Sequence, residues 1–154
     1  MKIQIIHVGK TKDRYAEQSV EEFVKRISQF GKVEINTLKA GGGASMPRDK
    51  VIADEGLRIA HCIPKDAFVI VLDEKGKQMS SVEFSQVLGR AKDKGQTLVF
   101  VIGGAFGLAP DLKGSADLVL SLSKMTFTHQ MIRPFLLEQI YRGFCILNGK
   151  EYHY

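Results

Sequence analysis

Residues 98–104 read Leu98-Val99-Phe100-Val101-Ile102-Gly103-Gly104, a run of five apolar residues that ends in two glycines. A second continuous apolar run covers Ala67–Leu72. Runs that are apolar on both faces are typical of central strands in a parallel sheet that helices cover on both sides. We therefore predict strands over Ala67–Leu72 and Thr97–Ile102 at the centre of such a sheet.

Outward from these runs, three more strand-like segments occur, at Lys2–Val8, Lys32–Leu38 and Leu118–Leu122. The second of them alternates apolar and polar residues, which favours an edge position. Apolar residues recur at helical spacing within 16–27, 52–63 and 84–91. Strands thus alternate with helices, and we expect one α/β domain over residues 1–154.

The last helix, expected near Gln130–Leu147, has apolar residues around most of its circumference. Either the helix is deeply buried within one chain, or its second apolar face is a subunit interface of a twofold homodimer. We favour the interface. Thr128 is a suitable N-cap, and Pro134 should kink the helix or mark its true beginning.

Composition sets broad limits on the function. The 154 residues include 22 Lys or Arg and 17 Asp or Glu, so the net charge is 22 − 17 = +5, a mild preference for a polyanionic partner such as nucleic acid. Cys62 and Cys145 lie far apart without a CxxC pair, which favours reduced thiols. No cluster of residues has metal-ligand spacing and no apolar run is long enough to span a membrane, so we expect a cytoplasmic protein without a metal.

Three segments have residues suited to ligand binding. Gly9-Lys10-Thr11 is similar to the end of a P-loop, but Gln4 occupies the position where the first glycine of that motif belongs, and we interpret it as a turn. Gly103 and Gly104 follow a central strand, where glycine permits a close ligand or simply a tight turn. Residues 121–130 contain several hydroxyl groups and His129, and their backbone would either bind the polar edge of a ligand or form a plain polar connection.

Basic and aromatic residues gather toward the C-terminus. His129, Arg133 and Arg142 could share a surface near the last helix, and Tyr152 and His153 belong to a tail that ends at residue 154. Aromatic rings and cations of this kind are what recognition of single-stranded RNA requires. The alternatives are solvated side chains and a frayed terminus.

Taken in order, several of these segments resemble the ribosomal RNA large subunit methyltransferase H family, which belongs to the SPOUT methyltransferases. The resemblance rests on Val99–Gly104, Leu120–Arg133, Glu138–Arg142 and Tyr152-His153, with Lys2–Lys10, Asp54–Gly56 and Leu72-Asp73 in support. It covers the whole chain. Thr128 stands where several relatives have proline, and Pro134 is another position where we expect variation.

The resemblance implies a parallel-sheet α/β fold flanked by helices with a deep C-terminal trefoil knot, and a homodimer. Rules of chain connection alone would instead favour a flavodoxin-like sheet without a knot. The implied activity is methylation of N3 of a pseudouridine in 23S rRNA within the assembled 70S ribosome, with S-adenosylmethionine as cofactor. The implied cofactor site consists of Leu72, Gly103, Gly104, Leu122, Ser123, Lys124, Met125, Thr126 and Phe127.

The resemblance also places His129, Arg133, Arg142, Tyr152 and His153 near the target nucleotide. His129 is then the candidate base or a group that positions the pyrimidine, while the two arginines would hold phosphate or a negative oxygen. Two other functions remain open. The chain could be a ribosome- or RNA-binding factor with a degenerate cofactor pocket, or a SPOUT methyltransferase that acts on another RNA.

Overall fold

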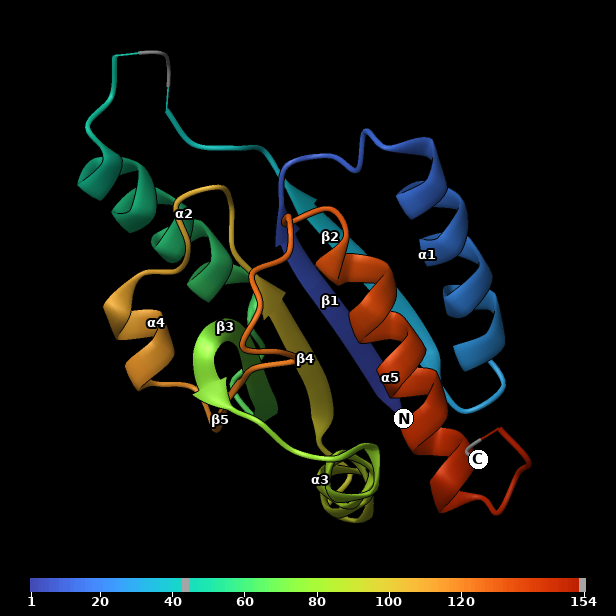
Figure 1. The fold of residues 1–154 in the computed structure, drawn as a ribbon. Helices are drawn as coiled ribbons and strands as arrows, with labels where there is room; N and C mark the ends of the chain where they lie inside the picture. Colours follow the sequence, from blue (N-terminus) through green and yellow to red (C-terminus); the bar gives the residue numbers. More distant parts are fainter. Residues whose placement is uncertain (43–44, 153–154) are drawn as a thin grey trace.

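The computed structural model describes residues 1–42, 45–152 and is built around one five-stranded sheet. Helices cover both faces of this sheet, which makes three layers (Figure 1). The strands are β1 Lys2–Val8, β2 Lys32–Leu38, β3 Ala67–Lys77, β4 Thr97–Ile102 and β5 Leu118–Leu120. The helices are α1 Arg14–Ile27, α2 Arg48–Cys62, α3 Ser81–Asp93, α4 Pro110–Gly114 and α5 Ile132–Leu147. The predicted α/β class is confirmed.

All strand pairs of the sheet are parallel, in the order β2-β1-β4-β3-β5. As predicted, β2 lies at an edge and β4 at the centre. A flavodoxin-like sheet has the order 2-1-3-4-5, so β3 and β4 have exchanged places here. The prediction from connection rules is wrong because β4 is inserted between two strands that precede it in the chain.

Local sequence explains where the helices begin. The Asp13 carboxylate accepts a hydrogen bond from the Tyr15 N–H at the start of α1. At the start of α3, Ser80 and Glu83 form a reciprocal capping box, which satisfies two backbone N–H groups. Pro47 stands directly before α2, where its missing N–H costs nothing.

Two apolar cores hold the layers together. The larger core packs α1, α3 and α5 against one face of the sheet, with Ile5, Phe100 and Phe144 among its most buried residues. The smaller core packs α2 and α4 against the other face, around Val99 and Val101. Because β4 supplies residues to both cores, its run of apolar residues has no polar face.

Helix α5 begins at Ile132, two residues later than predicted. Pro134 is its third residue and therefore marks its beginning without interrupting it. The N-cap position is Met131, which has no capping side chain. Thr128 instead orders the turn before the helix, because its Oγ1 accepts from the Met131 N–H at 3.2 Å and its carbonyl oxygen accepts from the Ile132 N–H at 3.1 Å.

The apolar circumference of α5 is mostly covered within the chain. The helix lies between α1 and α3 on the sheet (Figure 1). Phe144 stacks on Phe30 with ring centroids 5.5 Å apart. A Cβ at Gly143 would come within 2.8 Å of Leu88 Cδ1, so α5 and α3 touch closely. Contacts within one chain therefore explain most of the apolar residues of α5, without a subunit interface.

Strand β3 continues beyond its predicted end as an arm over Asp73–Lys77. Leu120 of β5 pairs with Leu72 and again with Lys77, so the arm leaves β5 and returns to it. The Ser121 N–H donates to the Lys77 carbonyl oxygen at 3.0 Å. A Cβ at Gly76 would lie 2.7 Å from the Val119 carbonyl oxygen, and only glycine permits this approach of two backbones. Figure 1 shows the arm as the curled end of the β3 arrow.

Among the described residues, no helix combines the length and the apolar composition that a membrane span needs. Cys62 and Cys145 are both free thiols.

Candidate active site

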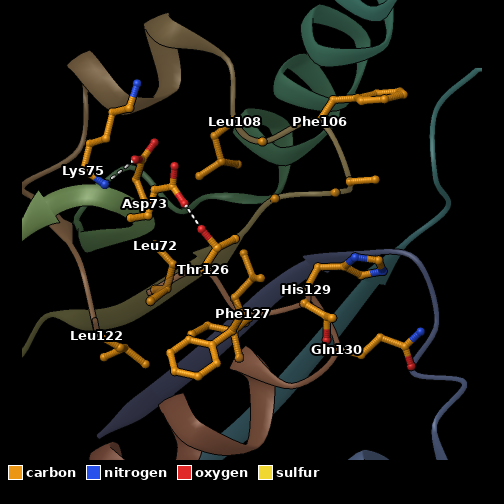
Figure 2. A pocket seen from close by; sticks show the side chains of 18 of the residues that line it. Leu72, Asp73, Lys75, Phe106, Leu108, Leu122, Thr126, Phe127, His129 and Gln130 are labelled. Atoms are coloured by element: carbon orange, nitrogen blue, oxygen red, sulfur yellow. Dashed lines mark hydrogen bonds between the residues drawn. The ribbon is translucent and has the colours of Figure 1, made fainter. Parts of the chain in front are cut away.

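A cavity of about 820 Å³ opens at the carboxyl ends of β3, β4 and β5. In a parallel sheet this edge is where loops are free to bind ligands. Three segments line the cavity, and Figure 2 shows side chains from each of them. They are the β3 arm at 72–75, the loop 102–108 after β4, and the segment 122–130 that leads into α5.

Gly103 and Gly104 line this cavity, as predicted. However, a Cβ at Gly103 would lie 3.0 Å from the Gly107 backbone and from Leu108 Cγ. A Cβ at Gly104 would lie 2.8 Å from a carboxylate oxygen of Glu55 on α2. A side chain at Gly103 would thus point into the loop itself, and one at Gly104 toward the Glu55 carboxylate. We expected Gly103 to leave room for a ligand. A side chain at this position would instead point toward Gly107 and Leu108.

The segment Leu122–Phe127 runs along the cavity in an irregular conformation with bends at Leu122, Lys124 and Met125. Two internal hydrogen bonds shape it: the Ser121 hydroxyl donates to the Ser123 carbonyl oxygen at 2.8 Å, and the Met125 N–H donates to Ser123 Oγ at 2.9 Å. Among the described residues, the backbone N–H groups of Lys124, Thr126 and Phe127 have no hydrogen-bond partner. Such free groups can bind the polar edge of a ligand, which is one of the two roles that the sequence left open for this segment.

Eight of the nine predicted cofactor residues line the cavity. Lys124 is the exception, because its side chain is exposed and lies outside the lining. Leu72, Leu122 and Phe127 supply apolar surface, and Thr126 is fixed by a hydrogen bond from its hydroxyl to the Glu74 carboxylate at 2.6 Å (Figure 2). The cavity therefore offers apolar walls and free backbone groups on the same side.

The charged wall of the cavity was missed by the sequence reasoning. The Asp73 carboxylate accepts from the Lys75 N–H at 2.8 Å and from Lys113 Nζ at 2.9 Å. Burial on its own would raise the pKa of Asp73, but these two hydrogen bonds outweigh it and hold the pKa below its usual value. The sequence did contain an indication of this charged wall, because Asp73 directly follows the apolar run Ala67–Leu72 and loops at the carboxyl ends of parallel strands bind ligands.

His129 lies at the edge of the cavity, between Thr128 and Gln130 (Figure 2). Burial lowers the pKa of its imidazole, and the positive charge of Arg133 lowers it further. His129 is therefore neutral at pH 7 and can accept a proton. Its role as a base stays a prediction.

Arg133 is buried, with 2% of its surface exposed, which corrects the expectation that it faces a substrate. Its Nη1 donates to Thr11 Oγ1 at 2.7 Å and its Nη2 donates to the Val8 carbonyl oxygen at 2.8 Å. The guanidinium also lies near His7. Burial and the positive charge of Arg133 together lower the pKa of the His7 imidazole to about 4. Arg133 thus holds the end of β1 and contributes electrostatically to His129.

Arg142 lies nine residues after Arg133 on α5, which is about 14 Å along the helix axis. Its Nη2 donates to Glu138 Oε1 at 2.6 Å, and its Nη1 donates to the Tyr152 carbonyl oxygen at 3.0 Å. The guanidinium also sits over the Tyr152 ring at 4.7 Å. Neither Arg142 nor Tyr152 lines the cavity of its own chain, and the predicted shared surface with His129 is not formed within it. His153 lies outside the described residues.

Known proteins are similar to this chain over nearly its whole length. A family model described as "Predicted SPOUT methyltransferase" matches residues 1–153. The chain belongs to the SPOUT methyltransferases. This SPOUT methyltransferase is 42% identical to the ribosomal RNA large subunit methyltransferase H of Geotalea daltonii and 43% identical to that of Trichlorobacter lovleyi, with 100% of each chain covered in both cases. These relatives show that it is a member of the ribosomal RNA large subunit methyltransferase H family.

A solved methylase family protein from Haemophilus influenzae Rd KW20 has a similar fold, with a TM-score of 0.54. The comparison covers 99% of the SPOUT methyltransferase and 70% of the other chain. At 12% identity, this likeness concerns the fold alone.

SPOUT methyltransferases use S-adenosylmethionine, and the residues of the cavity fit this cofactor. Leu72 and Leu122 would offer the cofactor apolar contact, and the free N–H groups of Thr126 and Phe127 would be available to its polar groups. Glu74 lies in the same wall without an ion pair among the described residues, and its carboxylate would suit a positive charge of the cofactor. Within residues 1–42 and 45–152, no group of three or more His, Cys, Asp or Glu side chains could hold a metal ion.

Proposed function

We propose that this protein methylates N3 of a pseudouridine in 23S rRNA, and that its substrate is the assembled 70S ribosome. The relatives named above are large subunit rRNA methyltransferases, and the net charge of +5 favours a polyanionic substrate. The proposal depends most on one observation, the position of His129 at the edge of the cavity, where burial and the charge of Arg133 lower the pKa of its imidazole. A ribosomal substrate also implies that the protein acts in the cytoplasm.

The chemistry requires a proton acceptor. N3 of the base bears an imino proton, which must leave as the new N–CH₃ bond forms. S-adenosylmethionine supplies an already activated methyl group, so the protein has mainly to position the base and accept this proton. The lowered pKa of His129 favours the neutral imidazole that can accept this proton, and its neighbours Thr128 and Gln130 are fixed by hydrogen bonds to Met131 and to the loop before α1.

We further propose that two chains form a homodimer. Phe127, Met131 and Phe135 remain 38–42% exposed beside the cavity, and the rings of Phe127 and Phe135 contact each other with centroids 5.2 Å apart. Arg142 and Tyr152 lie away from the cavity of their own chain. A twofold pair would allow Arg142, Tyr152 and His153 of one chain to reach the substrate at the cavity of the other.

The resemblance also implies a trefoil knot, and we propose that the β3 arm is part of it. Leu120 pairs with residues on both sides of the arm, at Leu72 and at Lys77. The close approach of Gly76 to the backbone of Val119 and Leu120 supports a loop that wraps around the chain where it leaves β5.

The proposal is tested by incubating the protein with labelled S-adenosylmethionine and ribosomes that lack the modification. Assembled 70S particles and free large subunits are offered separately, and mass spectrometry of the rRNA locates the methyl group. We expect a methylated pseudouridine from 70S particles only. Methyl transfer to a different RNA would overturn the substrate, and absence of cofactor binding would indicate an RNA-binding factor instead.

A further inference from the structure

The segment Gly9–Tyr15 joins β1 to α1 and includes the first two residues of α1. It carries exposed side chains that have no role in the site described above. We refer to it as the β1–α1 rim. Lys10, Lys12 and Arg14 are exposed, and their side chains make no hydrogen bond or ion pair with any residue that the structure describes. Tyr15 is 82% exposed, the most exposed of the large apolar side chains in the described chain.

The rim is attached directly to the turn that carries His129. Oε1 of Gln130 accepts hydrogen bonds from the N–H groups of Lys12 and Asp13, both at 2.8 Å. Arg133 adds the two bonds to Val8 and Thr11 described above. Figure 2 shows Gln130 extending from the His129 turn toward this segment. The residues on either side of His129 therefore hold the rim in a fixed position relative to the cavity.

The rim also borders the cavity, because Asp13 is one of the residues that line it. The Asp13 carboxylate is occupied as the N-cap of α1, where it accepts from the Tyr15 N–H at 2.9 Å. The negative charge is thus directed at the positive end of the helix. The side chains that remain free on the rim are three cations and one aromatic ring.

We propose that the β1–α1 rim binds the rRNA strand next to the target nucleotide. Lys10, Lys12 and Arg14 would contact backbone phosphates, and the Tyr15 ring would stack on an unpaired base. Cations that neutralise phosphates supply affinity without sequence preference, and aromatic rings add stacking for single-stranded nucleotides. The inference rests on the proposed function and adds a substrate surface to it. A fixed surface of this kind would deliver the nucleotide to His129 in a defined position.

A charge-matched comparison tests the proposal. The rim variant carries Lys10→Ala, Lys12→Ala and Arg14→Ala. The control variant carries Arg90→Ala, Lys92→Ala and Lys94→Ala, three exposed cations without described ion pairs at the end of α3. They precede β4 and therefore lie at the amino end of the sheet, opposite the cavity. Each variant lowers the net charge by three, so nonspecific attraction changes equally.

Binding to 70S ribosomes is measured over a range of salt concentrations, with cofactor affinity measured separately. For the rim variant we expect affinity to fall at least tenfold and the slope of log Kobs against log salt to flatten by about two, close to 0.7–0.9 for each lost phosphate contact. The control variant should keep the wild-type slope. S-adenosylmethionine affinity should be unchanged in both variants.

Tyr15 is tested in the same assay. Tyr15→Ala should weaken ribosome binding by about fivefold or more, while Tyr15→Phe should retain it because the ring still stacks. Equal binding by the rim and control variants would overturn the rim proposal. A rim variant that loses ribosome binding because it changes its oligomeric state would also overturn it, since the rim would then be a protein interface. Failure of the wild-type protein to act on ribosomes would instead overturn the proposed function.

Discussion

The Nη2 atom of Arg133 donates a hydrogen bond to the carbonyl oxygen of Val8, 2.8 Å away, and thereby joins the first turn of the last helix to the last residue of the first strand. These two residues are 125 positions apart in the chain. The bond lies directly before the β1–α1 rim, and its donor Arg133 follows His129 by four residues and lowers the pKa of that imidazole. The position of the candidate base therefore depends on a buried contact that involves no substrate or cofactor.

Arg133→Met should destabilise the protein by about 1–3 kcal/mol. Methionine fills much of the space, but it leaves the Val8 carbonyl oxygen and the Thr11 hydroxyl without their donor. Urea denaturation followed by circular dichroism measures the change. The matched control is Arg90→Met, an exposed arginine whose loss should change the free energy of unfolding by less than about 0.5 kcal/mol. Equal stability of the two variants would show that the Arg133 bonds contribute nothing.

His7 should titrate near pH 4 in the folded protein. Its side chain is 5% exposed, and burial together with the charge of Arg133 lowers its pKa from 6.5 to about 4. Because the unfolded chain takes up this proton near pH 6.5 and the folded chain does not, the free energy of unfolding should decrease as the pH falls from 6.5 to 4. The decrease has an upper limit of roughly 3 kcal/mol.

NMR titration of the imidazole signals measures this pKa directly. Denaturation at several pH values then tests the link to stability, and His7→Asn should reduce the dependence over this range. The exposed His61 provides the control, since His61→Asn should leave the dependence in place. A His7 signal that titrates at its ordinary value would contradict the buried electrostatics around Arg133.

The rate of methyl transfer should depend on the protonation of His129. Because burial and Arg133 lower its pKa, kcat/KM should be level from pH 8 down to about 6.5 and should fall at lower pH, where the imidazole becomes protonated. His129→Gln should lower kcat by about 100-fold and remove the acid limb of the profile. Cofactor affinity provides a control and should change little. An unaltered acid limb in the variant would assign the proton to another group.

Gly76→Ala should destabilise the protein strongly, because the added methyl group would overlap the backbone of β5 at 2.7–2.8 Å. Neither backbone can move without breaking the pairing at Leu120, and we expect a loss of about 2 kcal/mol or more. Gly114→Ala is the matched control, since the space around Gly114 is open. Similar melting temperatures for the two variants would mean that the β3 arm is not tightly packed.

The strands and most helices could be predicted because their local patterns agree with the final packing. The apolar run at Thr97–Ile102 is explained by two cores that both use β4, and the apolar residues at helical spacing within 84–91 lie in α3. The order of β3 and β4 could not be predicted from local pattern. Insertion of β4 depends on contacts between segments that are distant in the chain, and connection rules favour the simpler arrangement.

For the candidate site too, the sequence indicated which residues are involved but not how the fold arranges them. The cavity residues were identified from motif resemblance, but the orientation of their side chains was not. Gly103 was expected to admit a ligand, although its missing side chain would point toward Gly107 and Leu108. Arg133 was expected on a surface shared with His129 and Arg142, and only the folded chain shows that it is buried with Val8 and Thr11 as its partners.

The central position of β4 has a consequence for synthesis of the protein. A nascent chain that ends before Thr97 contains β1 and β3 but lacks the strand that separates them. Each of these strands would present an unpaired, apolar edge until β4 has emerged, and such edges are prone to wrong pairing with other chains. We therefore expect no stable half-folded intermediate. Truncations within the first two thirds of the chain should be insoluble, with folding completed only after most of the polypeptide is available.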